Sequence, residues 1–256
     1  MSDGVTHFAD QGYAVIPALF CATDLQAIRE RVDLLVTRHR AGEAAVLSMA
    51  VSIADVSRQH PQRNPGVTPE AWKHEPYIIG DLIALDVHFA AFLAKETLWL
   101  RVAELLACPP VEVVFHFCNL TRKPARIGPA IGWHRDADNR YFAAEDGRTL
   151  RLLIPLHPMS VSNGGTALVP GSHLARDASS EHSVCPEVPA GYGLAIHSAL
   201  LHGGSPNRSE DARDALVVQF GHRASTLRHY APETLSLASR EVFLRHVAEQ
   251  GEALER

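Results

Sequence analysis

Hydrophobic residues in the first part of the chain recur at the spacing of an α-helix. Four of them repeat every three or four positions: Leu25, Ile28, Val32 and Leu35. This period places side chains on one face of a helix. Just ahead of the repeat, Thr23 stands three residues before Gln26, which is the pattern of a capping box at a helix start. The sequence therefore predicts a helix here, with its apolar face on the core.

Two further segments indicate helices. The first covers residues 86–107, with an apolar stripe formed by Leu98, Val102, Leu105 and Leu106. The second covers residues 229–256, where the apolar members are Leu237, Val242, Leu244 and Val247. Residues 12–16 are apolar and end at Pro17, as expected for a short strand that enters the domain. We interpret the helices as padding on one side of a core.

From residue 111 the pattern changes from helical to alternating. One face of the segment 111–121 carries Val113, Phe115, Phe117, Asn119 and Thr121. Similar apolar runs follow at 150–156, 166–169, 192–197 and 215–220, with glycine, proline, serine and asparagine between them. Several short strands with turn signals between them predict a β-sandwich or a small barrel. We expect one domain over residues 1–256, with a largely helical flank (1–110), a β core (111–228) and a helical tail (229–256).

The polar segment 57–70 interrupts the helical part of the chain. It contains three prolines and one glycine, which predicts a long exposed loop. Irregular loops of this length in compact domains are often lids or binding segments. We expect residues 57–75 and 137–149 to form a lid and the rim of a pocket.

Composition and charge exclude several classes of protein. The chain has 256 residues, of which 46% are hydrophobic and 21% charged, so it can bury a sizeable core. Twenty-four basic and 29 acidic side chains give a net charge of −5, so no global positive field attracts nucleic acid or anionic lipid. No run of about 18 apolar residues predicts a membrane span. We expect neither nucleic acid nor membrane as a partner.

The cysteines and the first residues indicate the cellular compartment. Four cysteines are widely spaced and form no C-x-x-C pair, so we expect reduced, mostly buried thiols. Residues 1–8 show neither a basic segment nor an apolar segment of a secretory signal. Both observations favour a cytoplasmic location.

Candidate metal ligands stand in an H-x-D pattern at His134 and Asp136. On a strand, side chains two positions apart point to the same side. If His202 arrives from another strand, the set becomes two histidines and one carboxylate. This triad leaves open positions on Fe(II) for a co-substrate and for dioxygen. Zn²⁺ accepts the same ligands, and with 15 histidines in the chain a chance partner is an alternative.

Arg213 lies 11 residues after His202, at the start of a predicted strand. A buried arginine beside a metal site is suited to a bidentate contact with a carboxylate. A dicarboxylic oxo acid needs that contact at one end and metal chelation at the other. The alternative is a surface charge, because residues 210–214 are rich in acidic side chains.

Four segments together resemble the phytanoyl-CoA dioxygenase-like branch of the Fe(II)/2-oxoglutarate oxygenases, which includes ectoine hydroxylase. Residues 8–17 are similar to the family's opening segment. Lys123-Pro124 ahead of residues 133–136 resembles its approach to the first metal ligand. Residues 163–173 resemble its N-G-x-L…P-G-S-H segment, and residues 202–207 with Arg213 resemble its distal signature. The resemblance covers most of the chain.

The resemblance implies a fold and a set of roles. The fold is mainly β with flanking helices, around a double-stranded β-helix of jelly-roll, cupin-like type. His134, Asp136 and His202 would hold Fe(II), and Arg213 would bind the distal carboxylate of 2-oxoglutarate. Thr121 matches a polar co-substrate contact. Family members often place serine two residues after the distal histidine, where this chain has Gly204, so the hydroxyl that assists Arg213 stays open.

The function implied is hydroxylation of a small metabolite or biosynthetic intermediate, with O2 consumed and succinate and CO2 released. Related halogenases have a small residue at the carboxylate position, so Asp136 favours hydroxylation, desaturation or ring formation. Two alternatives keep the fold: a cupin-like Zn²⁺ or Mn²⁺ hydrolase or isomerase, and a catalytically silent binding module. The sequence predicts neither the substrate nor the oligomeric state.

The residues around the triad have simpler interpretations as well. We expect Trp133 to be a packing wall beside the metal and His173 to be a turn or pocket-edge residue. His116 and His197 lie in apolar runs and are expected in the core. Residues 138–140 (Asp138, Asn139 and Arg140) are candidates for substrate contact or for a solvated loop.

Overall fold

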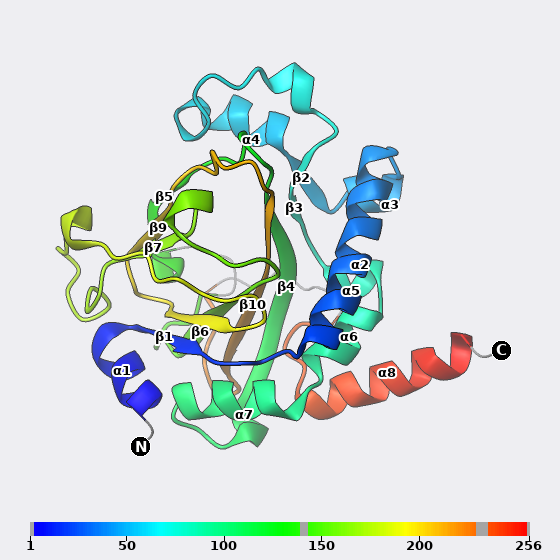
Figure 1. The fold of residues 1–256 in the computed structure, drawn as a ribbon. Coiled ribbons are helices and arrows are strands. Elements are labelled where there is room, and N and C mark those ends of the chain that lie inside the picture. The colour runs from blue at the N-terminus through cyan, green and yellow to red at the C-terminus, as the bar shows by residue number, and fades with distance from the viewer. Residues whose placement is uncertain (1–2, 139–142, 229–234, 255–256) are drawn as a thin grey trace.

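The centre of the molecule consists of two antiparallel sheets that face each other (Figure 1). The structure is a computed structural model that describes residues 3–138, 143–228 and 235–254. In spatial order, the larger sheet contains β1 (Tyr13–Ile16), β8 (Gly193–His197), β6 (Thr149–Pro155), β10 (Arg213–His222), β4 (Val113–Lys123), β3 (Pro76–Ile79) and β2 (Ala50–Ser52). The smaller sheet contains β5 (Ile131–His134), β9 (His202–Gly204) and β7 (Thr166–Leu168). The mainly β core is therefore confirmed.

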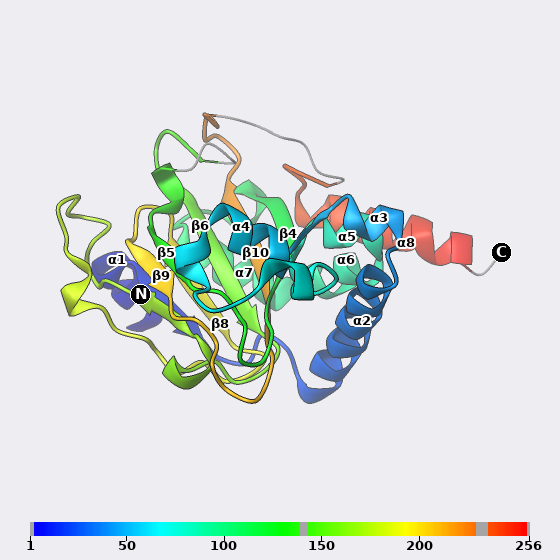
Figure 2. The same ribbon diagram turned by 90° about the horizontal axis from the view of Figure 1, so that it is seen from above.

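Several helices cover the outer side of the larger sheet. The helices are α1 (Asp3–Gln11), α2 (Ala22–Arg40), α3 (Ala44–Leu47), α4 (Ile53–Gln59), α5 (Leu82–Leu85), α6 (His88–Leu93), α7 (Glu96–Leu105) and α8 (Arg240–Leu254). Of these, α4 packs on Tyr77 in a separate cluster. Figure 2 shows α2, α5, α6 and α8 on one side of this sheet and β5 and β9 on the other. Ile28 of α2, Trp99 of α7 and Leu216 of β10 belong to one buried cluster, so the main core lies between helices and sheet. This leaves the inner side of the sheet for a cavity.

The helix over residues 22–40 begins differently from the prediction. Its apolar face is the predicted one, and Leu25, Ile28, Val32 and Leu35 are buried. The cap, however, is Cys21, whose backbone N–H donates to Asp24 Oδ2 at 3.1 Å. The predicted box of Thr23 and Gln26 is wrong because the helix begins two residues earlier than this box implies, at Ala22.

An irregularity between β4 and β10 changes which side chains share a face. Gln219 pairs with Phe117, but the next residue, Phe220, pairs with Phe115. Phe115 therefore packs on the helical side, 4.8 Å from Phe243 between ring centroids, while Phe117 clusters with Val217. The prediction of one continuous face from Val113 to Thr121 is wrong, because this β-bulge reverses the alternation after Phe115.

The C-terminal helix is shorter than expected and has a different apolar face. α8 spans Arg240–Leu254; residues 229–234, where the tail was predicted to begin, lie outside the described residues. Phe243 is fully buried, whereas Leu244 and Leu237 are each 44% exposed. Val242 and Val247 pack at the edge of the core as predicted.

The segment 57–70 is more ordered than the predicted exposed loop. It contains the end of α4, the 3-10 turn η1 (Pro61–Arg63) and the start of η2 (Pro69–Trp72). Asn64 is 2% exposed and its side-chain amide donates to the carbonyl of Ile127 at 2.8 Å. The polar sequence predicts exposure at this position, but Asn64 is buried. The hydrogen bond to Ile127 offsets the cost of removing its amide from water.

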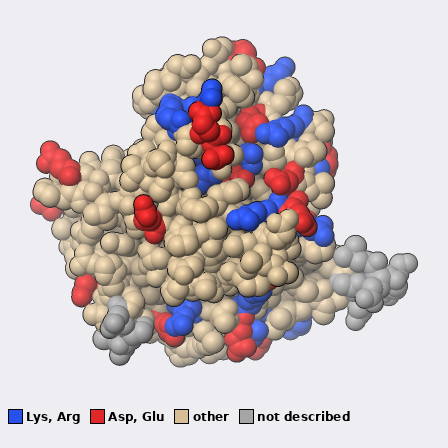
Figure 3. Space-filling view, viewed as in Figure 1, with Lys and Arg blue, Asp and Glu red and all other residues tan. Residues whose placement is uncertain are grey.

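Charged side chains are interspersed on the face seen in Figure 3, where neither sign forms a broad area among the described residues. None of the helices in the described ranges combines the length and the apolar character needed to cross a membrane.

Candidate metal centre

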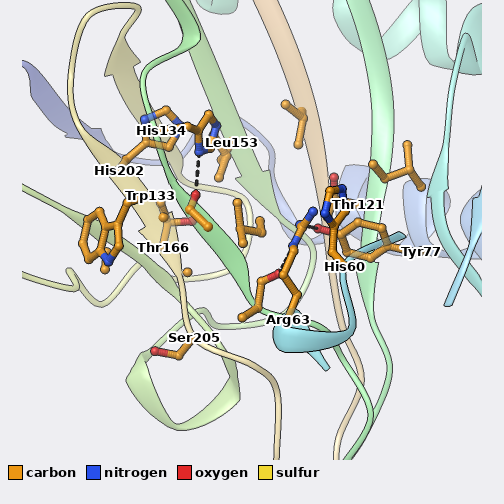
Figure 4. A pocket seen from close by; sticks show the side chains of 18 of the residues that line it. His60, Arg63, Tyr77, Thr121, Trp133, His134, Leu153, Thr166, His202 and Ser205 are labelled. Atoms are coloured by element: carbon orange, nitrogen blue, oxygen red, sulfur yellow. Dashed lines mark hydrogen bonds between the residues drawn. The ribbon is translucent and has the colours of Figure 1, made fainter. Parts of the chain in front are cut away.

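A cavity of about 870 Å³ lies between the two sheets (Figure 4). Its walls come from β3, β4, β6 and β10 of the larger sheet, from β5, β7 and β9 of the smaller one, and from η1. The segment 57–75 contributes His60, Gln62 and Arg63 to the lining. This part of the expected lid therefore borders the cavity.

The three predicted ligands converge at one end of this cavity. His134 and His202 are paired across β5 and β9, and their ring centroids are 4.2 Å apart. Asp136 Oδ1 lies 3.6 Å from His134 Nε2, and Asp136 Oδ2 lies 3.8 Å from His202 Nε2. One ligand atom from each residue falls within 4.8 Å of the others, close enough to share a single ion.

Asp136 reaches this point through a turn and not through strand alternation. β5 ends at His134, and Asp136 begins the 3-10 turn η4 (Asp136–Asp138). The backbone N–H of Ala137 donates to the carbonyl of Ser198 at 2.7 Å, and the buried Arg135 donates to the carbonyl of Ser172. The expectation that a strand carries both H-x-D residues is therefore wrong, but the turn brings the carboxylate to the same place.

Backbone carbonyls orient both imidazoles. His134 Nδ1 is 2.8 Å from the carbonyl oxygen of Gly132, and His202 Nδ1 is 2.9 Å from that of Leu200. A carbonyl oxygen only accepts, so Nδ1 carries the proton and Nε2 presents its lone pair to the site. Burial lowers the pKa of His202 to about 4, which keeps this ring in the neutral form that binds metals.

The Asp136 carboxylate is buried without hydrogen bonds. It is 5% exposed, and neither of its oxygens has a hydrogen-bond partner. Arg151 Nε lies 2.9 Å from Oδ2 as an ion pair, without the alignment of a hydrogen bond. Burial alone would raise the pKa of Asp136, but the nearby Arg151 guanidinium outweighs it and holds the pKa well below its usual range. An anionic carboxylate facing two imidazole lone pairs fits a divalent cation such as Fe(II).

Arg213 is buried, so the alternative of a surface charge is wrong. It is 2% exposed, and burial lowers its pKa to about 10, which still leaves it charged at neutral pH. Its Nη2 donates to the carbonyl of Gly164 at 3.1 Å and its Nη1 to Met159 Sδ at 3.4 Å. Nε has no partner, so the guanidinium keeps donor capacity for an anion.

Thr121 lines the cavity from β4, near Tyr77 and His60 (Figure 4). Trp133 lines the cavity from β5 and is 44% exposed. Its indole therefore borders the cavity and is also in contact with solvent. Asp138 is paired with Arg176 at 2.8 Å on the surface. Asn139 and Arg140 lie outside the described residues.

Three further histidines have structural partners. His116 is 1% exposed and its Nδ1 accepts from the Gln219 amide at 3.0 Å. His197 Nδ1 accepts from the backbone N–H of Ala199, and His173 Nε2 donates to the carbonyl of Ala9. None of these three residues is among the described residues that line the cavity.

Two charged residues of the site carried no assigned role in the sequence. Arg151 interrupts the apolar run of β6, which was the available signal for an inward-facing charge. In the sequence, Lys123 belongs to the Lys123-Pro124 motif without a role of its own. In the structure it is fully buried and is paired with Arg213 across the sheet.

A jelly-roll core that brings two histidines and one carboxylate together defines the class of non-haem iron oxygenases. The comparison with protein families agrees. A model of the phytanoyl-CoA dioxygenase (PhyH) family matches residues 8–215, and the chain belongs to this family.

Individual relatives are more distant. The dioxygenase Trt7 of Aspergillus terreus (strain NIH 2624 / FGSC A1156) is 36% identical over 103 residues, which is 36% of this chain and 35% of Trt7. The match thus spans about a third of that relative.

Solved structures share the fold at low identity. EctD from S. alaskensis with bound Fe has a TM-score of 0.70 at 20% identity, over 94% of this chain and 84% of EctD. AviO1 from Streptomyces viridochromogenes Tue57 has a TM-score of 0.70 at 22% identity, over 87% and 95% of the two chains. The carbocyclase SnoK from nogalamycin biosynthesis has a TM-score of 0.65 at 16% identity, over 91% and 89%. The predicted double-stranded β-helix is confirmed.

Proposed function

We propose that this protein is a non-haem Fe(II)- and 2-oxoglutarate-dependent oxygenase that hydroxylates a small metabolite or biosynthetic intermediate. The observation that carries the proposal is the convergence of His134, Asp136 and His202, with a buried carboxylate that lacks hydrogen bonds. Membership of the phytanoyl-CoA dioxygenase family supports it. Among structures of the same fold, EctD was crystallised with Fe, and separately with 2-oxoglutarate and 5-hydroxyectoine.

The residues of the chain have distinct tasks in this proposal. His134, Asp136 and His202 hold Fe(II), which with 2-oxoglutarate and O2 supplies the oxidising chemistry for an unactivated C–H bond and releases succinate and CO2. Arg213 binds the distal carboxylate of 2-oxoglutarate, and the hydroxyl of Thr121 contacts the same co-substrate. Arg151 holds the Asp136 carboxylate in its charged form.

The cavity supports a small-molecule substrate. Its volume of about 870 Å³ lies in the range of roughly 300–1,000 Å³ that is typical of small-molecule sites. Trp133 offers an exposed apolar surface beside His134, and His60, Gln62 and Arg63 offer polar groups on the wall. Asp136 occupies the position where a halide would need room, which favours hydroxylation, desaturation or ring formation over halogenation.

The cellular location belongs to the same proposal. Cys21, Cys108, Cys118 and Cys185 are all free thiols, which favours a reducing compartment such as the cytoplasm.

The anaerobic ultraviolet–visible spectrum with Fe(II) and 2-oxoglutarate tests the proposal. We expect a weak charge-transfer band in the wild-type protein and its loss in His202→Ala. The matched control is His173→Ala, because His173 bonds to the backbone of Ala9 outside the cavity, and this variant should keep the band. Absence of the band in the wild-type protein, together with Zn²⁺ retained through purification, would favour a hydrolase or isomerase instead.

A further inference from the structure

Two basic side chains meet at one backbone carbonyl deep in the β core. Lys123 of β4 and Arg213 of β10 are paired across the sheet and are 0% and 2% exposed. Lys123 Nζ donates to the carbonyl of Gly164 at 2.9 Å, and Arg213 Nη2 donates to the same oxygen at 3.1 Å. Nζ also donates to the carbonyl of Ser205. An ammonium has three donors, so one N–H of Lys123 remains.

No carboxylate among the described residues forms an ion pair with either cation. The titratable and charged groups close enough to shift the pKa of Lys123 are Arg213 from β10, Arg63 from η1 and the thiol of Cys185 from the segment between β7 and β8. Tyr77 of β3 and Asp214 of β10 lie close enough to Arg213 to raise its pKa. The Asp214 carboxylate, however, is ion-paired with Arg122 at 2.6 Å. Positive charge buried here without an anion is costly, so this arrangement favours a ligand that brings negative charge.

Lys123 lies directly behind the cavity wall at Gly204. A Cβ atom added to Gly204 would be 3.2 Å from Lys123 Nζ. Gly204, Ser205, Thr121 and Thr166 all line the cavity. A side chain two residues after His202 would therefore come close to the Lys123 amine.

We propose that Lys123 is a second cationic donor to the distal carboxylate of the oxo-acid co-substrate, beside Arg213, and that it takes up a proton when that carboxylate binds. The inference rests on the proposed function and names a further residue of the same site. It also answers which group assists Arg213 where Gly204 provides no hydroxyl.

The protonation state of Lys123 supports a link between carboxylate binding and proton uptake. Burial, with Arg213 and Arg63 adding to it, lowers the pKa of Lys123 to about 6. At pH 7 the free protein therefore holds this amine mostly neutral. A carboxylate beside it favours the charged form and raises its pKa, so binding draws a proton from the buffer.

Calorimetry at pH 7 on the metal-loaded protein under anaerobic conditions tests the inference. The two ligands are 2-oxoglutarate and 2-oxopentanoate, which carries a methyl group in place of the distal carboxylate. Each titration is repeated in two buffers of different ionisation enthalpy, which gives the number of protons taken up. We expect the wild-type protein to take up protons with 2-oxoglutarate, up to about one per site, and close to none with 2-oxopentanoate.

Lys123→Met removes the charge and keeps the length of the side chain. We expect this variant to lose the proton uptake and to bind 2-oxoglutarate about tenfold more weakly, with its affinity for 2-oxopentanoate unchanged. The control Lys73→Met changes an exposed lysine and should match the wild-type protein.

Proton uptake in the wild-type protein that is equal for the two oxo acids would overturn the inference, whether or not the variant folds. The inference would also be overturned if Lys123→Met bound 2-oxoglutarate with the wild-type affinity and took up as many protons as the wild-type protein. If the wild-type protein bound neither oxo acid, the proposed function itself would fail.

Discussion

At the scale of single residues, the site depends on polar groups that are buried without complete hydrogen bonding. The Asp136 oxygens and Arg213 Nε are such groups. A buried polar group of this kind costs free energy, so it is expected where a ligand completes the bonding. The two groups are of opposite charge, which matches a cation at one end and a carboxylate at the other.

Replacing Arg213 separates co-substrate binding from metal binding. We expect Arg213→Ala to lose about 2–5 kcal/mol of binding free energy for 2-oxoglutarate, roughly 30- to several-thousand-fold in affinity, while metal loading is largely kept. Titration of the anaerobic Fe(II) protein measures the affinity, and metal analysis measures the loading. Arg126→Ala is the control, because Arg126 pairs with Glu210 on the surface. An unchanged dissociation constant in Arg213→Ala would contradict its assignment.

The sequence predicted better which three candidate ligands converge than the way they are placed. His134, Asp136 and His202 were recognised by residue type and motif. The sequence did not predict that Asp136 sits in a turn after β5, because the local H-x-D pattern fits a strand equally well. It gave no role to Lys123 or Arg151, because their burial arises from tertiary packing.

At the scale of elements, most helices and strands follow from the apolar pattern, and the exceptions have local causes. The short strands β2, β3, β5 and β9 have three or four residues each, too few for a clear alternation. The bulge opposite Gln219 and Phe220 changes the faces of β4, and a one-residue shift of this kind cannot be read from alternation.

Two neighbouring residues of α8 test which face of this helix packs on the core. Phe243 is fully buried beside Phe115 and Trp99, so Phe243→Ala is expected to lower the free energy of unfolding by about 3–5 kcal/mol. Leu244 is 44% exposed, so Leu244→Ala should change it by less than about 0.5 kcal/mol. Urea denaturation of both variants measures the difference. Equal losses would contradict this orientation of the helix.

At the scale of the whole molecule, buried histidines couple folding to pH. Burial lowers the pKa of His116 and of His197 to about 4, against about 6.5 in the unfolded chain. Between these values the unfolded chain binds more protons than the folded one. The free energy of unfolding is therefore greatest above pH 6.5 and falls as the pH is lowered toward 4.

We expect each of these two histidines to contribute a slope of up to about 1.4 kcal/mol per pH unit in this window. Denaturation of the metal-free protein at a series of pH values measures it. His116→Asn should reduce the slope by the share of this one histidine, whereas His182→Asn, at an exposed position, should leave it unchanged. A curve for the wild-type protein that is flat from pH 6.5 to 4 would show that these rings titrate normally in the fold.

The central claim is that one Fe(II) ion binds where β5, η4 and β9 meet. Anomalous diffraction at the iron edge, from a crystal grown anaerobically with Fe(II), tests it most directly. We predict one strong peak about 2.0–2.2 Å from His134 Nε2, His202 Nε2 and an oxygen of Asp136. Iron bound only elsewhere on the molecule, with these three side chains free of metal, would contradict the account.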